Sequence, residues 1–260
     1  WEGIRLLNRR MIFLKEHLDR LYNGAKKLNI NIGINREGLL ALVQKTLDAN
    51  NMESGVHIRI IITRGLKKTP YQHPNANAGS SSIVIIPEFK QPDEKINIEG
   101  IRLVTVKTRR GTPDTQDPQL NSLSKHNCIS ACIEADQAGV DEGIMLDINN
   151  NVSTCNSTNF FIVKKKEIWT STGQYCLPGV TRRAVIDICQ GNDIPIFLKD
   201  FSIIDVHAAD EAFVTGTFAG IIPVIEIDGR KISKGKRGEF TFKLQRLYED
   251  KLAQICPKKI

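Results

Sequence analysis

A predicted turn that ends in glycine is the first candidate for a functional site. Leu177-Pro178-Gly179 precedes a predicted helix that begins near Val180 and Thr181. The first N–H groups of a helix have no partner within the helix, and its dipole favours an anion at that end. Gly216 and Thr217 would add a close backbone approach and a hydroxyl. Each segment has features that suit a phosphate or a similar anion, but taken alone each glycine is more often an ordinary turn residue.

Composition and charge limit the classes of function. The 260 residues are 41% hydrophobic and 25% charged, which is typical of a soluble globular protein. The longest apolar runs, such as residues 83–86, are far too short to span a bilayer, and the first residues lack a secretory apolar region. The net charge is +7, but the basic residues are scattered and only 6% of residues are aromatic. We therefore expect no membrane or nucleic-acid partner, and a basic balance that suits anionic ligands.

The cysteines argue against a metal site. The six cysteines form no Cys-x-x-Cys pair and no histidine-rich spacing accompanies them, so no metal ligands are predicted. Cys128 and Cys132 stand four residues apart on a predicted helix, where they share a face, and core packing is the expected role of both. Cysteine use at this level is typical of a reducing compartment, so we expect a cytoplasmic protein.

Hydrophobic spacing predicts the elements that must hold these residues. Leu14, Leu18 and Leu21 recur at helical steps, and Asn35 could cap the helix that follows. The pattern predicts helices over 12–28, from 37, over 123–138, from 181 and over 239–253, with strands at 57–64, 82–87, 101–107, 144–148, 158–163, 212–216 and 222–227. We expect an α/β (α+β) protein with an N-terminal domain of residues 1–112, a linker of 113–120 and a C-terminal domain of 121–260.

Several segments, in order, resemble class IV (fold type IV) aminotransferases of the branched-chain and D-amino acid branches. They cover nearly the whole chain and comprise Trp1–Arg5, Glu16–Leu21, His57–Gly65, Ala138–Glu142, Asn159–Phe161, Leu177–Arg182, Ala209–Phe213, Thr215–Thr217 and Ile222–Val224. The family's first strands are missing and there is no initiator Met, so we expect the chain to begin inside a longer product. The resemblance implies two lobes, the second a pseudo-barrel, a pyridoxal 5'-phosphate cofactor and a homodimer.

The resemblance also assigns binding residues. Arg20 falls where the family grips the cofactor phosphate, which a guanidinium can do through two parallel hydrogen bonds. Val180 and Thr181 at the start of the predicted helix, together with Gly216 and Thr217, would complete that phosphate site. Arg59 and Arg64, on or beside a strand, and Arg109 and Arg110, at the domain junction, are candidates to bind a substrate carboxylate, with surface pairing as the alternative.

The position of the family's catalytic lysine is altered. An aminotransferase needs a lysine amine that bonds to the cofactor aldehyde and then moves the substrate's α-proton. An ungapped register from Ala138–Glu142 places Asn121 in that position, and an amide cannot form this bond. Lys125 stands four residues on, about one helical turn or roughly 6 Å of rise. We therefore expect Lys125 to be a relocated catalytic amine near the cofactor and Asn121 to be a cofactor contact, with a solvated helix lysine as the alternative.

A second departure concerns the cofactor ring. The family carries Glu where Thr154 stands, five residues before Asn159, and that carboxylate keeps the pyridine nitrogen protonated. Thr154 offers only a neutral hydrogen bond, so the ring nitrogen is expected to stay unprotonated and the ring to withdraw electrons more weakly. The alternative is that Thr154 merely packs.

Three functions follow from the resemblance. The first is transfer of an amino group between an amino acid and a 2-oxo acid. The second is a lyase like aminodeoxychorismate lyase, which releases pyruvate without an amino acceptor. The third is a non-catalytic relative that binds pyridoxal 5'-phosphate or another phosphorylated ligand, because both Asn121 and Thr154 depart from the family pattern.

Overall fold

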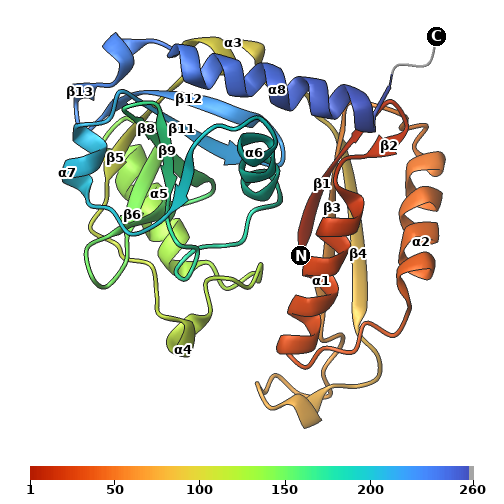
Figure 1. Ribbon diagram of the computed structural model, residues 1–260. Helices are drawn as coiled ribbons and strands as arrows, with labels where there is room; N and C mark the ends of the chain where they lie inside the picture. The colour runs from red at the N-terminus through yellow and green to blue at the C-terminus, as the bar shows by residue number, and fades with distance from the viewer. Residues whose placement is uncertain (258–260) are drawn as a thin grey trace. The chain divides into compact units, whose positions relative to one another are not determined.

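The computed structural model describes residues 1–257, and these form two compact units. Of the described residues, the first unit contains 1–91, 121–123 and 253–257, and the second contains 92–120 and 124–252. Figure 1 labels the helices and strands of each unit.

The first unit is an antiparallel sheet with helices α1 (Leu14–Lys27) and α2 (Arg36–Ala49) on one face. The strand order is β2-β1-β3-β4, with β1 at Glu2–Leu7, β2 at Arg10–Met11, β3 at Val56–Thr63 and β4 at Ser82–Phe89. Alternate residues of β1 and β3, such as Ile4 and Ile58, are buried under the leucines of the two helices. The side chain of Asn35 accepts a hydrogen bond from Gly38 N and so caps α2, as predicted.

The second unit is built on a nine-stranded mixed sheet of order β10-β9-β8-β11-β12-β5-β6-β7, with β13 paired to β12. Its strands are β5 (Ile101–Thr105), β6 (Glu142–Leu146), β7 (Val152–Cys155), β8 (Asn159–Lys164), β9 (Glu167–Thr170), β10 (Ile196–Leu198), β11 (Glu211–Gly216), β12 (Gly220–Ile227) and β13 (Arg230–Lys231). The helices of this part of the chain are α3 (Glu94–Glu99), α4 (Pro113–Gln116), α5 (His126–Gln137), α6 (Val180–Gly191), α7 (Ile203–His207) and α8 (Glu239–Ile255). Short 3₁₀ turns lie at Pro74–Ala76 and Ser233–Gly235.

Two expectations about the elements are wrong in part. Helix α5 begins at His126 rather than near 123, so Lys125 takes its N-cap position and residues 121–125 are not helical. The helical-rise estimate between Asn121 and Lys125 therefore does not hold. On α5, Cys128 is buried as expected, but Cys132 is exposed, so the expected core packing of Cys132 is wrong.

The compact units also divide differently from the expected boundary at residue 112. Residues 92–112 lie in the second unit. The reason is that β5 pairs in parallel with both β12 and β6, so it is an internal strand of the large sheet.

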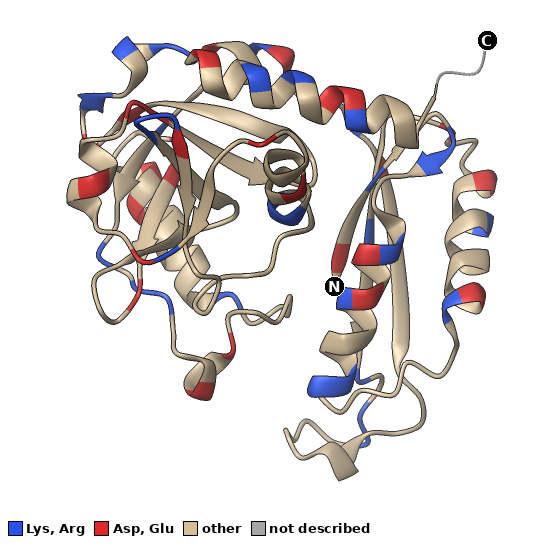
Figure 2. Cartoon of the chain, in the orientation of Figure 1, with Lys and Arg blue, Asp and Glu red and all other residues tan. Residues whose placement is uncertain are grey.

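Lys and Arg lie interspersed with Asp and Glu along the helices (Figure 2). Within residues 1–257, no helix combines the length and the apolar composition needed to cross a membrane.

Candidate functional site

The N-terminus of α6 is open for an anion. Gly179 is its N-cap residue, and the first backbone bond of this 12-residue helix runs from Arg183 N to Gly179 O at 2.9 Å. No side chain among the described residues caps α6. The amides of Val180 and Thr181 therefore precede the first helical hydrogen bond, and they lie at the positive end of the helix dipole.

Asn159 contacts both the loop that precedes α6 and the end of β11. It begins β8, and its Nδ2 donates to Leu177 O at 3.0 Å in the loop that leads into α6. Across the sheet it pairs with Thr215, the residue before Gly216. The Thr215 hydroxyl is buried and has no hydrogen-bond partner among the described residues. An unpaired buried hydroxyl beside unbonded amides suits a polar or anionic ligand.

The close packing at Gly179 makes its substitution a sharp test of this arrangement. A Cβ atom at this position would lie 2.0 Å from Asn159 Oδ1. Gly179→Ala is therefore expected to lower the free energy of unfolding by about 1–3 kcal/mol, the usual cost of overpacking, and to weaken binding of a phosphorylated ligand. Urea unfolding and calorimetric titration with pyridoxamine 5'-phosphate measure the two effects.

The matched control is Gly24→Ala in α1, where an added Cβ meets nothing within 4 Å. Alanine in an open helix interior is expected to stabilise the protein by about 0.5–1 kcal/mol. If Gly179→Ala behaves like Gly24→Ala, Asn159 does not hold the loop against Gly179.

Thr154 is fixed by the turn that follows β7. Its hydroxyl donates to Thr158 O at 2.7 Å. The Glu142 carboxylate in turn accepts hydrogen bonds from Ser157 Oγ at 2.6 Å and from Thr158 Oγ1 at 2.7 Å. The turn is also joined to β6 by a 2.7 Å bond from Gly143 N to Asn156 Oδ1. Thr154 is therefore a buried, oriented hydroxyl and not a mobile one.

Burial raises the pKa of Glu142 above its ordinary value of 4.5, against the opposing effect of the Ser157 and Thr158 hydroxyls. A raised pKa in the folded state means that this group stabilises the fold at low pH, and that the contribution is lost as the pH rises through the folded value. Glu142→Gln keeps an acceptor without the charge. In urea unfolding, the free energy of unfolding of the variant minus that of the parent protein is expected to increase from pH 4.5 to pH 8. A difference that does not change with pH would contradict the raised pKa of Glu142.

The other candidates of the second unit lie in different surroundings. Arg109 is exposed. Arg110 is buried, and its guanidinium donates to Tyr175 O at 3.1 Å, Cys128 Sγ at 2.8 Å and Pro118 O at 3.4 Å, so each of its three nitrogens is bonded within the chain. Lys125 is half-buried immediately before the first turn of α5. Thr217 lies in the turn between β11 and β12.

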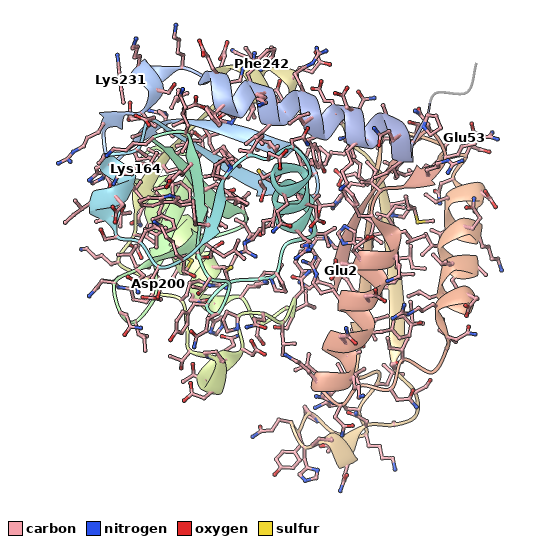
Figure 3. The ribbon with its side chains drawn as sticks, in the orientation of Figure 1. Glu2, Glu53, Lys164, Asp200, Lys231 and Phe242 are labelled. Carbon is pink, nitrogen blue, oxygen red and sulfur yellow. The ribbon has the colours of Figure 1, made fainter. Side chains whose placement is uncertain are left out.

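In the first unit, Arg20 belongs to a buried ionic cluster with Glu2 and His17. Arg20 Nε and Nη2 donate to the two Glu2 oxygens at 2.8 and 2.7 Å, and His17 Nδ1 lies 2.7 Å from Glu2 Oε2. Glu2 and His17 are completely buried, whereas 14% of the Arg20 side chain is exposed. Glu2 lies beside α1 in Figure 3. The guanidinium is therefore rigidly oriented by a bidentate pair.

Asn121 is paired with the first residue of the chain. Trp1 N donates to Asn121 O at 2.9 Å, and Asn121 Nδ2 donates to Trp1 O at 2.7 Å. Trp1 Nε1 also donates to Ser122 O at 3.1 Å. The guanidinium of Arg59 lies 4.6 Å over the Trp1 ring, so Arg59 is grouped with Asn121 in this unit. Arg64 instead donates to the carbonyl oxygens of Leu28 and Asn29, away from this group.

These residues fit one end of pyridoxal 5'-phosphate better than the other. The open amides of α6, the Gly216 turn and the unpaired Thr215 hydroxyl suit the phosphate. Asn121, which the ungapped sequence register predicts at the family's lysine position, has no amine that could react with the aldehyde end.

Sequence reasoning did not identify the residues that orient the candidates. Asn159 was noted only as part of a family segment, and Glu2, His17 and Glu142 were not singled out for a site. Their roles depend on contacts with residues distant in sequence, such as Asn159 with Leu177. A carboxylate at position 2 with His and Arg spaced three apart at 17 and 20 was the one signal available, since the latter two share a helix face.

Comparison with known proteins agrees with this architecture. Residues 1–227 match the family model of amino-transferase class IV. The chain is 39% identical over 249 residues to branched-chain-amino-acid aminotransferase-like protein 2 of Arabidopsis thaliana. The aligned region covers 96% of this chain and 44% of that protein. It is 31% identical over 241 residues to a branched-chain-amino-acid aminotransferase of Pseudomonas aeruginosa, which covers 91% of this chain and 77% of that protein.

A solved structure shows the same fold. The branched-chain aminotransferase of the thermophilic archaeon Thermoproteus uzoniensis with norvaline superimposes with a TM-score of 0.86 at 30% identity, over 99% of this chain and 85% of that one. The chain spans less than half the length of the Arabidopsis relative. The family match over residues 1–227, together with the fold type IV architecture, shows that the chain belongs to the class IV aminotransferase family.

Proposed function

We propose that this chain binds pyridoxal 5'-phosphate and transfers an amino group between an amino acid and a 2-oxo acid. The observation that carries the proposal is the meeting of the α6 N-terminus and the β11–β12 turn at Asn159, beside a buried hydroxyl with no partner among the described residues. This arrangement suits a phosphate dianion, and the chain belongs to a family of aminotransferases. The whole protein's activity is part of the proposal, because the chain matches less than half of the Arabidopsis relative.

The proposed roles are divided among the chain's own residues. The amides of Val180 and Thr181 and the Gly216–Thr217 turn are proposed to hold the phosphate. The family resemblance also assigns a phosphate contact to Arg20. Thr154 contacts the ring nitrogen. When bound, the cofactor supplies a conjugated ring that withdraws electrons from the carbon undergoing reaction.

Lys125 is the proposed amine, and its Nζ moves the substrate's α-proton. It is the N-cap residue of α5, immediately before the first turn of that helix. Arg59 and Arg109 are proposed to bind the substrate carboxylate. The substrate is an amino acid, and branched-chain relatives make an aliphatic side chain the first to test.

A single-turnover assay tests the proposal. The cofactor-loaded protein is mixed with leucine, alanine or D-alanine without an acceptor, and the 2-oxo acid released per protein is measured. One equivalent or less of 2-oxo acid, with turnover restored by adding 2-oxoglutarate, is the expected result. Continuous release of pyruvate from aminodeoxychorismate without any acceptor would instead show the lyase.

A second candidate function has its own observation. The ungapped sequence register predicts Asn121 at the family's lysine position, and its amide nitrogen donates to Trp1 O at 2.7 Å. A protein that binds the cofactor but uses no lysine would be a non-catalytic binder. Tight binding of pyridoxamine 5'-phosphate with no 2-oxo acid from any donor would favour this second function.

We further propose a cytoplasmic homodimer. Six free cysteines among the described residues agree with a reducing compartment, and the resemblance to class IV aminotransferases supports the dimer. Light scattering after gel filtration should give about twice the 29.1 kDa mass of the chain. A mass of one chain at micromolar concentration would contradict the dimer.

A further inference from the structure

The hydroxyl of Thr215 is buried without a hydrogen-bond partner. Only 2% of Thr215 is exposed, and its Oγ1 makes no hydrogen bond with any of residues 1–257. Three other buried threonines of the second unit, Thr154, Thr170 and Thr241, each donate their hydroxyl to a carbonyl or carboxylate oxygen. Thr215 differs from these three, and a buried donor without an acceptor lowers stability unless a ligand supplies one.

The register of β11 places the Thr215 side chain beside Asn159. Alternate residues of a strand share one face of the sheet, so Thr215 lies on the same face as Phe213. On the neighbouring strand β8, Asn159 pairs with Thr215 and Phe161 pairs with Phe213. The rings of Phe213 and Phe161 stack with 4.8 Å between their centroids, in agreement with a shared face. Directly opposed side chains have Cβ atoms about 4.5–5.5 Å apart, so Thr215 and Asn159 are neighbours on this face.

The same face of the sheet meets the start of α6. Asn159 Nδ2 donates to Leu177 O at 3.0 Å, and a Cβ atom at Gly179 would lie 2.0 Å from Asn159 Oδ1. Gly179 is the N-cap residue of this 12-residue helix, so the amides of Val180 and Thr181 follow it directly. Two independent features, the open amides and the unpaired hydroxyl opposite Asn159, therefore favour an anion in the same place.

We infer that Thr215 is a further phosphate-binding residue, whose hydroxyl donates to the phosphate that the α6 N-terminus is proposed to hold. The inference rests on the proposed function, and all of its residues belong to the second unit. A phosphate dianion can only accept hydrogen bonds, and the hydroxyl hydrogen of Thr215 is not directed at any oxygen of the described residues. The ligand-free protein thus buries an unmet donor, and the phosphate satisfies it on binding.

Thr215→Val tests this inference, because valine has almost the same shape but no hydroxyl. Two effects of opposite sign are expected. Without ligand, the urea midpoint of unfolding should rise, since a methyl group replaces an unpaired buried hydroxyl. In calorimetric titration, pyridoxamine 5'-phosphate should bind about 10–100-fold more weakly, the loss expected for one hydrogen bond to a charged group. Pyridoxamine, which lacks the phosphate, should bind equally well to the variant and to the parent protein.

Thr170→Val is the matched control. Thr170 is also a buried strand threonine of the second unit, with 1% exposed, but its hydroxyl donates to Phe160 O at 2.9 Å. Its replacement removes that hydrogen bond, so the urea midpoint should fall, whereas the affinity for pyridoxamine 5'-phosphate should stay at the parental value. Thr215→Ser keeps the hydroxyl and is expected to bind pyridoxamine 5'-phosphate more tightly than Thr215→Val does.

The outcomes separate this inference from the function on which it rests. A lower urea midpoint for Thr215→Val, or an unchanged affinity for pyridoxamine 5'-phosphate, would overturn the role of Thr215 and leave the proposed phosphate site standing. A parent protein that binds pyridoxamine as tightly as pyridoxamine 5'-phosphate would overturn the phosphate site itself. If Thr215→Val does not fold, Thr215→Ala removes the same hydroxyl, and its titration beside that of Thr215→Ser decides the question.

Discussion

Replacement of Arg20 by methionine is expected to lower the free energy of unfolding by about 3–5 kcal/mol, the cost of removing one partner from a buried ion pair. Glu2 is fully buried and accepts two hydrogen bonds from the Arg20 guanidinium. Among the contacts of the described residues, the carboxylate then keeps the one with His17 Nδ1. The variant is also expected to bind phosphorylated cofactor more weakly. Urea unfolding at pH 7 measures the first effect and calorimetric titration the second.

The pH dependence of the same variant has a definite sign. Burial alone would raise the pKa of Glu2, but hydrogen bonds from Arg20 and His17 hold it below its ordinary value of 4.5. A lowered pKa gives stability that is present above the unfolded value and is lost as the pH falls through the folded value. The difference in free energy of unfolding between the parent protein and Arg20→Met is therefore expected to become smaller as the pH is lowered below about 4.5.

Arg36→Met is the control for this prediction. Arg36 lies in the same unit and pairs with Asp19, but 42% of its side chain is exposed, so its loss should cost at most about 1 kcal/mol. Equal effects of the two substitutions would show that the Glu2 cluster is not a buried pair in solution.

Lys125→Met is expected to reduce the rate of amino transfer by about 10²–10⁴-fold, the usual contribution of a positioned acid–base group. Methionine keeps the length and the apolar stem of the side chain but has no amine. Because the residues proposed to hold the phosphate do not include Lys125, the dissociation constant for pyridoxamine 5'-phosphate is expected to change little. Single-turnover release of 2-oxo acid measures the rate.

The matched control is Lys95→Met in α3, where the lysine pairs with Glu99 and 71% of its side chain is exposed. Its rate should equal that of the parent protein. If Lys125→Met also keeps the parental rate, the amine lies elsewhere, whereas unchanged folding with no detectable rate agrees with the proposed role.

Local chemistry in the sequence was enough to predict much of the fold. Leucines at helical spacing gave the correct faces of α1 and α2, and Asn35 was recognised as a cap because its side chain acts within three residues. Gly139 follows α5 with a positive φ of 68°, as expected of a residue that ends a helix. Short strands such as β7 and β10 were missed, because three or four residues carry too little periodicity to distinguish a strand from a loop.

The anion site remains a prediction, and the sequence did not reveal how its side chains are oriented. An anion site at the α6 N-terminus follows from a glycine-led turn before a helix. The hydrogen bond from the Asn121 amide nitrogen to Trp1 O joins two residues that are 120 positions apart. The hydrogen bond from the Thr154 hydroxyl to Thr158 O depends on the conformation of the turn between them. Such contacts are set by tertiary packing, so spacing along the chain does not reveal which side-chain atom remains for a ligand.

The most direct test of the central claim is to incubate the protein with pyridoxal 5'-phosphate, reduce it with borohydride and map the modified peptide by mass spectrometry. Modification at Lys125, absent from Lys125→Met, is the result that a relocated catalytic amine predicts. Bound cofactor with every lysine unmodified would contradict the aminotransferase and leave a cofactor-binding protein built on an aminotransferase fold.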